Sequence, residues 1–250
     1  MEQFLLNPNL PQNDVTLVIM SGGNYNLISK VEALGISVKT VDSCPLLAEP
    51  VNSHADMVIH HLGGNRFAAS SMNLNISSLL EMEGASIHYI EEKLGNRYPS
   101  DVLLNFARIG VKVFGRIDVM PLSLKYFFND NGIDMINVNQ GYAKCSTAVV
   151  DENSIITADA SIAKAAKKAG IDVLIISQGN IVLNGYDTGF IGGCCGKVGR
   201  WKMLFTGDIY SHPDGKKISD FLSDKKIQVI SLSSGPLLDI GGILPIKEVC

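Results

Sequence analysis

The sequence of 250 residues is poor in charge, contains a single tryptophan and has no long apolar run. Charged residues make up 18% of the chain and the formal net charge is −4, which argues against the extended basic surface that nucleic acids require. No segment reaches the roughly eighteen uncharged apolar residues of a membrane-spanning helix. The first residues lack the basic start and apolar stretch of a signal peptide. We therefore expect a cytoplasmic protein that binds neither nucleic acid nor membrane.

The cysteines include no CxxC pair, which argues against a zinc knuckle or a thioredoxin-type motif. Glycine pairs at 22–23 and 63–64 match neither GxGxxG nor a Walker A loop and are typical of turns. We therefore expect no cofactor. An odd number of cysteines in a cytosolic chain indicates free thiols. They are Cys44, Cys145, Cys194, Cys195 and Cys250.

Hydrophobic residues are abundant, at 46%, which favours strands buried on both faces. One pattern recurs at intervals of roughly fifty residues, as in repeat architectures. It consists of a helical stretch, a turn residue and an apolar strand. The turn residue is Gly35, Gly84, Gly132 or Gly170 in four copies, and the fifth copy has Lys226 instead. Glycine here predicts a helix that ends in a left-handed conformation and passes directly into a strand.

Apolar residues three and four apart predict helices before these turns, at 24–34, 75–83, 121–131, 160–169 and 216–225. Asp159 and Asp214 are expected to cap two of them. Strand pairs precede the helices, for example 57–62 with 66–70 and 102–109 with 111–114. Each unit therefore reads strand, strand, helix, strand.

The segments near the two ends of the chain together make up the fifth unit. Strand 15–20 opens a unit without its first strand, and 242–246 is a first strand with no unit after it. We expect the two to pair and to close a ring of five units in a single domain, 1–250. The alternative is an ordinary doubly wound sheet, which also alternates strands and helices.

In such a ring the first strand of each unit lines a central hole, so residues at these strands are the candidates for a site. They are His54, Asp56, His60, Ser100, Asp101, Asn105, Gln140, Tyr142, Lys144, Asp187, Gly193, Cys194, Cys195, Asp239, Gly241 and Gly242.

A regular strand would place His54, Asp56 and His60 on one face. Residues two apart on a strand are about 6.5 Å from each other, so few geometries would bring all three to one metal ion. We therefore expect no metal, and a partly buried histidine paired with aspartate instead.

Four short blocks resemble a known family. The segment 52–59, where Asp56 opens an apolar strand, resembles the segment that grips a guanidinium, and 98–103, with Asp101, resembles the block that opens the next blade. The segment 143–146 resembles the stretch after a catalytic histidine, and 236–242 resembles the segment leading into a catalytic cysteine. The family is the penteins, which modify guanidino groups: arginine and agmatine deiminases, dimethylarginine dimethylaminohydrolases and amidinotransferases.

The resemblance implies a five-bladed α/β propeller of β-β-α-β repeats with pseudo-five-fold symmetry. It also implies a small cationic ligand in the central hole. In the family a thiolate attacks the guanidinium carbon, carboxylates hold the cation and a histidine moves protons. We expect the ligand to be bound by residues in the hole: His54, Asp56, Asp101, Asn105, Gln140, Lys144, Asp187 and Asp239.

The sequence departs from the family at two places. Gln140 stands near the position of the family's histidine, and Gly242 stands at or beside that of its cysteine. Neither residue can perform that chemistry. Cys194 and Cys195, in a glycine-rich segment beside Lys197, could offer a relocated thiol. A structural role is the favoured interpretation of the pair, because cysteine is commonly a small buried residue.

These observations leave two main functions. One is a divergent C–N hydrolase for a guanidino or other cationic compound, which lacks the standard triad. The other is a non-catalytic protein that binds a small cation or uses the propeller as an interaction surface. A metal-dependent hydrolase is a third and more distant alternative.

Overall fold

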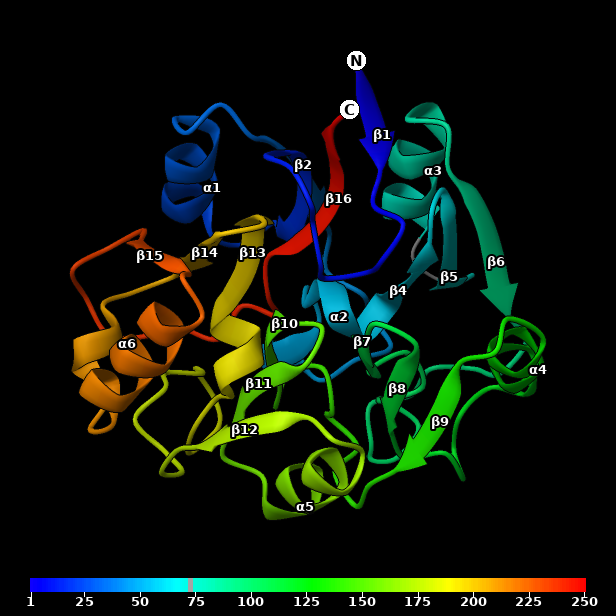
Figure 1. Ribbon diagram of the computed structural model, residues 1–250. Helices are drawn as coiled ribbons and strands as arrows, with labels where there is room; N and C mark the ends of the chain where they lie inside the picture. Colours follow the sequence, from blue (N-terminus) through cyan, green and yellow to red (C-terminus); the bar gives the residue numbers. More distant parts are fainter. Residues whose placement is uncertain (72–73) are drawn as a thin grey trace.

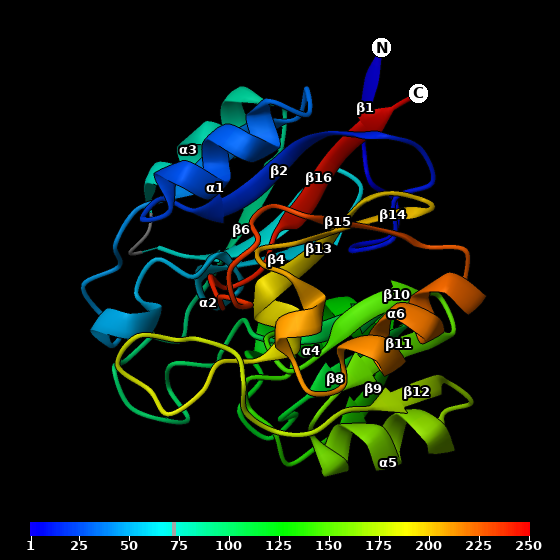
Figure 2. The ribbon, with the colours of Figure 1, turned by 90° about the vertical axis from the view of Figure 1, so that its left-hand side faces the viewer.

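The computed structural model describes residues 1–71 and 74–250, and their strands form five small sheets arranged in a ring (Figure 1). Four of these sheets have three strands each and one has four. The first strands of the blades lie toward the centre, and the longer helices lie on the rim (Figures 1 and 2). The arrangement confirms the predicted five-bladed propeller and rules out the doubly wound sheet.

Each complete blade repeats one topology. In the first, β4 (Ile59–Gly63) pairs antiparallel with β5 (Arg66–Ser70), helix α3 (Leu74–Met82) crosses over, and β6 (Ser86–Ile90) returns parallel to β5. The other three complete blades are β7 (Ala107–Ile109), β8 (Lys112–Gly115), α4 (Leu122–Asp130) and β9 (Asp134–Asn137); β10 (Ala148–Asp151), β11 (Ser154–Thr157), α5 (Ala160–Lys168) and β12 (Asp172–Ile175); and β13 (Cys195–Gly199), β14 (Lys202–Phe205), α6 (Gly215–Asp224) and β15 (Gln228–Ser231).

The remaining blade joins the two ends of the chain. Strand β16 (Leu244–Val249) pairs antiparallel with β2 (Val15–Ser21), which is followed by α1 (Tyr25–Glu32) and β3 (Ser37–Val41). This confirms the predicted closure. A short strand that the sequence did not predict, β1 (Glu2–Phe4), covers the outer edge of β16. Both ends of the chain therefore lie side by side (Figure 1).

The ends of the helices follow the predicted glycine rule. Gly35, Gly84, Gly132 and Gly170 all have positive φ, between 64° and 93°. Lys226, which replaces glycine in the fifth copy, adopts the same conformation with φ of 61°. The backbone geometry of the repeat thus persists where its preferred residue has been lost.

The two predicted helix caps have different outcomes. The carboxylate of Asp159 accepts a hydrogen bond from the Ile162 amide at 2.8 Å and caps α5, as predicted. Asp214 precedes α6 but makes no capping bond. Its carboxylate is held instead by the Ser177 amide and the Lys217 ammonium group.

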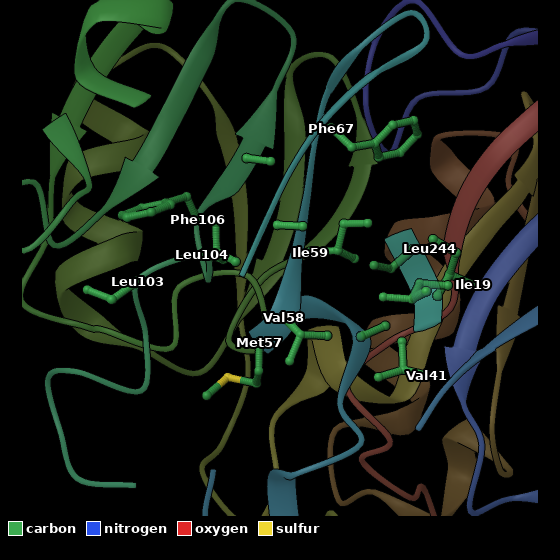
Figure 3. Packing of buried hydrophobic residues seen from close by; sticks show 14 of the residues in the cluster. Ile19, Val41, Met57, Val58, Ile59, Phe67, Leu103, Leu104, Phe106 and Leu244 are labelled. Atoms are coloured by element: carbon green, nitrogen blue, oxygen red, sulfur yellow. The ribbon is translucent and has the colours of Figure 1, made fainter. Parts of the chain in front are cut away.

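The largest apolar cluster lies where the β4 and β7 blades meet the blade that joins the chain ends (Figure 3). Phe67 and Phe106 are among its largest fully buried side chains. Short 3-10 helices at Glu49–Val51, Ile191–Cys194 and Ile209–Ser211 connect neighbouring segments. Across the described residues, no helix has the length and apolar character needed to cross a membrane.

Candidate functional site

The side chains at the centre of the ring come from the segments that lead into the first strands. His54 and Asp56 belong to a single helical turn, α2 (Ala55–Val58), and its N-cap, directly before β4. This corrects the prediction that His54, Asp56 and His60 share one strand face. The strand begins only at Ile59, because the amides of His54 and Met57 bond back three residues to close turns.

A thiol and a carboxylate from two different blades meet at this centre. The Sγ atom of Cys145 donates to Oδ2 of Asp56 at 2.9 Å, and both side chains are buried. Asn105, from a third blade, holds the pair: its Nδ2 donates to the Asp56 carbonyl at 3.0 Å and to Cys145 Sγ at 3.2 Å. Its Oδ1 accepts from the amides of Lys144 and Cys145.

A second carboxylate, Asp239, lies on the other side of His54. Its Oδ1 is 3.8 Å from His54 Nδ1 and accepts the Gly241 amide at 3.0 Å, while Oδ2 accepts the Phe190 amide at 2.8 Å. Gly193 makes room for this carboxylate, since a β-carbon there would lie 1.9 Å from Asp239 Oδ1. Position 193 therefore requires glycine, because any side chain there would collide with the Asp239 carboxylate.

Burial controls the ionisation of this cluster. It raises the pKa of Asp56, against the opposing effects of Lys144 and His54, and it raises the pKa of Asp239, against that of His54. Burial also raises the pKa of the Cys145 thiol well above its ordinary value, and the charges of Asp56 and Asp239 raise it further. Cys145 is thus a protonated hydrogen-bond donor rather than an activated thiolate.

A pocket of about 570 Å³ opens onto His54 and Asp239. Three carboxylates line it, those of Asp42, Glu49 and Asp239. No lysine or arginine of the described chain is among its lining residues. The rest of the wall mixes polar groups with apolar side chains such as Leu183 and Ile240. Its polar groups include the Ser21 and Ser53 hydroxyls, which bond to each other at 2.7 Å.

The structure brings some predicted residues into this centre and places others elsewhere. His54, Asp56, Asn105, Lys144 and Asp239 are buried in or beside the cluster.

Asp101 and Gln140 have partners of their own at the margin of the cluster. Asp101 is buried and accepts the Tyr142 hydroxyl at 2.5 Å. Gln140 donates to Asp159 at 3.2 Å and lines a separate cavity of about 160 Å³.

Asp187, predicted to line the hole, is exposed in the segment between β12 and β13 and is not among the residues that line the large pocket. Gly185, two residues before it, has a positive φ and lies against Pro50. Gly242 lies at the centre, but its amide serves only to bond the Gly193 carbonyl.

Cys194 and Cys195 are buried, and both thiols donate to the Ile191 carbonyl at 3.1 Å. Burial raises the pKa of Cys195 to about 12. Neither thiol is among the residues lining the large pocket. Their predicted catalytic role stays a prediction, and this geometry supports the structural alternative.

Sequence reasoning missed Cys145 as a partner of Asp56 and the pocket carboxylates Asp42 and Glu49. From the sequence, Cys145 was named only as a free thiol and as part of the block 143–146. Asp42 and Glu49 lie between β3 and α2, outside the first-strand segments from which candidates were drawn. The only pattern in the sequence that pointed to Cys145 was the resemblance of 143–146 to the pentein segment after the catalytic histidine.

One group of potential metal ligands stands out at the centre. A ring nitrogen of His54, a carboxylate oxygen of Asp56 and the sulfur of Cys145 all lie within 4.8 Å of one another. His60 points elsewhere: its Nδ1 bonds the Leu104 carbonyl, and its ring packs edge-on against Phe106 and Phe128.

This is the pentein fold, and solved structures of guanidino-modifying enzymes share it. An amidinotransferase of the saxitoxin biosynthetic pathway from Microseira wollei is 12% identical, with 91% of each chain covered and a TM-score of 0.56. The inosamine-phosphate amidinotransferase of Streptomyces griseus is 9% identical, with coverage of 99% of this chain and 98% of that one, and a TM-score of 0.60. The agmatine deiminase of C. jejuni is 8% identical, with coverage of 93% and 91% and a TM-score of 0.57. At these identities the likeness shows the fold alone.

The chain belongs to a family of unknown function (DUF6873), whose profile matches residues 19–244. No curated protein matches the sequence.

Proposed function

We propose that this protein binds a small cationic molecule, with a guanidino or amino group, in the pocket that His54 and Asp239 help to line. The observation that carries the proposal is the charge of the walls: three carboxylates and, within the described chain, no lysine or arginine. A cation entering this pocket is attracted from several sides.

Asp239 is suited to hold the cation. The amides of Phe190 and Gly241 each donate to a different oxygen of its carboxylate, which fixes its orientation. A carboxylate has about four acceptor sites, so each oxygen can still accept from a ligand. A planar guanidinium can donate two parallel charge-assisted hydrogen bonds to such a group.

The size and rim of the pocket fit a small ligand. A volume of about 570 Å³ falls within the roughly 300–1,000 Å³ of small-molecule sites. Tyr25 lines the pocket with an exposed ring, which offers an aromatic face to a cation. The fold that the chain shares with an agmatine deiminase supports a guanidino compound as the first ligand class to test.

Thermal shift with a panel of guanidino and amino compounds tests this proposal. A ligand present at about 100 times its Kd adds roughly 2.7 kcal/mol to the unfolding free energy, so the melting temperature should rise. The rise should shrink in Asp239→Asn and Glu49→Gln. The matched control is Asp187→Asn, which removes a carboxylate outside the pocket and should leave the shift intact. Equal loss in all three variants, or no shift with any cation, contradicts the proposal.

A second candidate is hydrolysis of a C–N bond in that ligand, favoured by the position of His54 beside Asp239 in the pocket lining. Water would add to the guanidinium carbon with His54 accepting its proton, and the amine would leave with that proton to give a urea derivative. Release of ammonia or amine by the wild type but not by His54→Ala would support it. Binding without any release leaves the protein as a non-catalytic binder.

A further inference from the structure

The ligand atoms at the centre of the ring come from three kinds of side chain and two blades. His54 and Asp56 lead into β4, and Cys145 leads into β10. A nitrogen, an oxygen and a sulfur atom of theirs lie within 4.8 Å of one another, and each residue is at most 3% exposed. Such a mixed set differs from an ordinary acidic cluster, because its donors include an imidazole and a thiol.

Two polar atoms of these side chains lack the partners that buried polar atoms normally have. Within the described chain, neither His54 Nδ1 nor Asp56 Oδ1 has a hydrogen-bond partner. Asp239 Oδ1, at 3.8 Å, is too far from His54 Nδ1 for a hydrogen bond. A buried polar atom without a partner costs about 1–3 kcal/mol, so these two atoms point to something that binds between them.

Among the residues that the structure describes, the two buried carboxylates of the cluster also lack a positively charged group in direct contact. Asp56 and Asp239 are both buried, and Lys144 is the lysine whose charge acts on both. Its ammonium group bonds the Gly192 carbonyl at 3.4 Å rather than either carboxylate. A divalent cation would supply the missing positive charge at short range.

We propose that His54, Asp56 and Cys145 bind a divalent transition-metal ion of the zinc type. Metal–ligand bonds of about 2.0–2.3 Å in a tetrahedron place ligand atoms roughly 3.3–3.7 Å apart. The observed group, with a 2.9 Å Cys145–Asp56 contact and no separation above 4.8 Å, needs only small side-chain shifts to reach that geometry. Imidazole, carboxylate and thiolate together suit zinc better than magnesium or calcium.

Neighbouring groups are placed to support the metal ligands. Asn105 Nδ2, at 3.2 Å from Cys145 Sγ, would stabilise the sulfur as a thiolate. Binding releases the thiol proton to solvent, since the metal takes the thiolate. The sulfur would then exchange its contact with Asp56 for a bond to the ion.

The site reaches the large pocket through His54, which lines it. Three protein ligands leave a fourth position for water, as in catalytic zinc sites. The metal proposal goes beyond the cationic-ligand proposal and stands without it, because Asp42 and Glu49 take no part in the metal site. If both hold, a metal-bound water takes the place of the water whose proton His54 would accept, and chelation abolishes any turnover.

Titration of the chelator-treated protein with Co²⁺ and Zn²⁺ tests the proposal. We expect one equivalent of Co²⁺ to bind and to produce thiolate-to-cobalt charge-transfer absorption in the near ultraviolet, which Zn²⁺ then removes by displacement. Cys145→Ser should abolish the band and weaken Zn²⁺ binding at least about 100-fold, since loss of even an outer-shell partner costs about 10–100-fold. Asp56→Asn should weaken Zn²⁺ binding while the charge-transfer band persists at saturating Co²⁺.

Cys195→Ser is the control, because it removes another buried thiol, one that donates to the Ile191 carbonyl and is not among the grouped ligands. It should leave the band and the Zn²⁺ affinity unchanged, and circular dichroism should show all variants folded. If the wild type binds neither ion, the proposal is overturned whatever the variants do. A band that survives in Cys145→Ser but disappears in Cys195→Ser also overturns it. A failed metal titration leaves the thermal-shift result with Asp239→Asn and Glu49→Gln unaffected, so the two proposals fail separately.

Discussion

The thiol of Cys145, which leads into β10, donates a hydrogen bond at 2.9 Å to the carboxylate of Asp56, which leads into β4. Two residues that are 89 positions apart in the sequence thus form a buried polar contact at the centre of the ring. The contact requires a protonated thiol, and burial maintains one.

Burial predicts the reactivity of the five cysteines. Cys250 is exposed and the other four are buried, so an aromatic disulfide reagent should label one thiol rapidly in the native protein and five after unfolding. Cys250→Ser should reduce the number of rapidly labelled thiols in the native protein to zero. Rapid labelling of Cys194 or Cys195 in the native state would contradict the burial and revive their predicted role as nucleophiles.

Asn105 should be a large contributor to stability. Asn105→Ala leaves the buried amides of Lys144 and Cys145 without their acceptor, at about 1–3 kcal/mol each. We expect a loss of about 3–5 kcal/mol in unfolding free energy, measured by urea denaturation. The matched control is Asn131→Ala, which removes one exposed bond to the Phe127 carbonyl and should cost below about 1 kcal/mol. Similar losses of stability in the two variants would refute the role of Asn105 in holding Asp56 and Cys145 together.

The conformation of Lys226 predicts a stabilising substitution. A left-handed residue other than glycine costs about 1–2 kcal/mol, whereas glycine adds about 0.5–1 kcal/mol of unfolded-state entropy. Lys226→Gly should therefore raise the unfolding free energy by about 0.5–1 kcal/mol. Gly132→Lys makes the reverse change at an equivalent turn with open space around it, and should lower stability by about the same amount. A destabilised Lys226→Gly variant would contradict the reasoning.

The buried His60 predicts loss of stability in mild acid. Burial, with smaller effects of Arg108, His61 and Lys144, lowers its pKa from 6.5 to about 3. Between these values the unfolded chain takes up a proton that the folded protein refuses. Stability is therefore fully present above pH 6.5 and falls by about 1.4 kcal/mol per pH unit as the pH drops toward 3.

Urea denaturation at pH 7 and pH 5 measures this effect. The wild type should lose about 2 kcal/mol more than His60→Asn between these two pH values. His88→Asn, on the exposed face of β6, should behave like the wild type. Equal losses in the wild type and His60→Asn would show that His60 is not the group responsible.

The sequence was sufficient to predict the ring, because each unit repeats its helix, its left-handed turn and its strand locally. The closure of the ring could also be predicted, because the unit that begins with strand 15–20 lacked a first strand and segment 242–246 could supply one. The candidate site was predicted only in part. His54, Asp56 and Asp239 were found because they precede first strands, whereas Cys145 needed a contact between blades that no local pattern reveals.

The predicted and observed positions of the pocket residues differ in two further respects. Asp187 was placed in the centre by its position in the repeat, but it is exposed in the connection between β12 and β13. Asp42 and Glu49 escaped notice because they reach the pocket from the connection between β3 and α2. Connections vary between units, so a repeat predicts the strands and turns better than it predicts what lines a pocket.

Calorimetric titration with arginine and with its uncharged ureido counterpart, citrulline, tests the central claim most directly. The two compounds have nearly the same shape and differ in the charge of one planar group. The charge of the pocket predicts that the guanidino compound binds at least about tenfold more tightly, equivalent to roughly 1.4 kcal/mol, and that Asp239→Asn removes the preference. Equal affinity for the two compounds, or a preference that persists in Asp239→Asn, would contradict the assignment of this pocket to a cationic ligand.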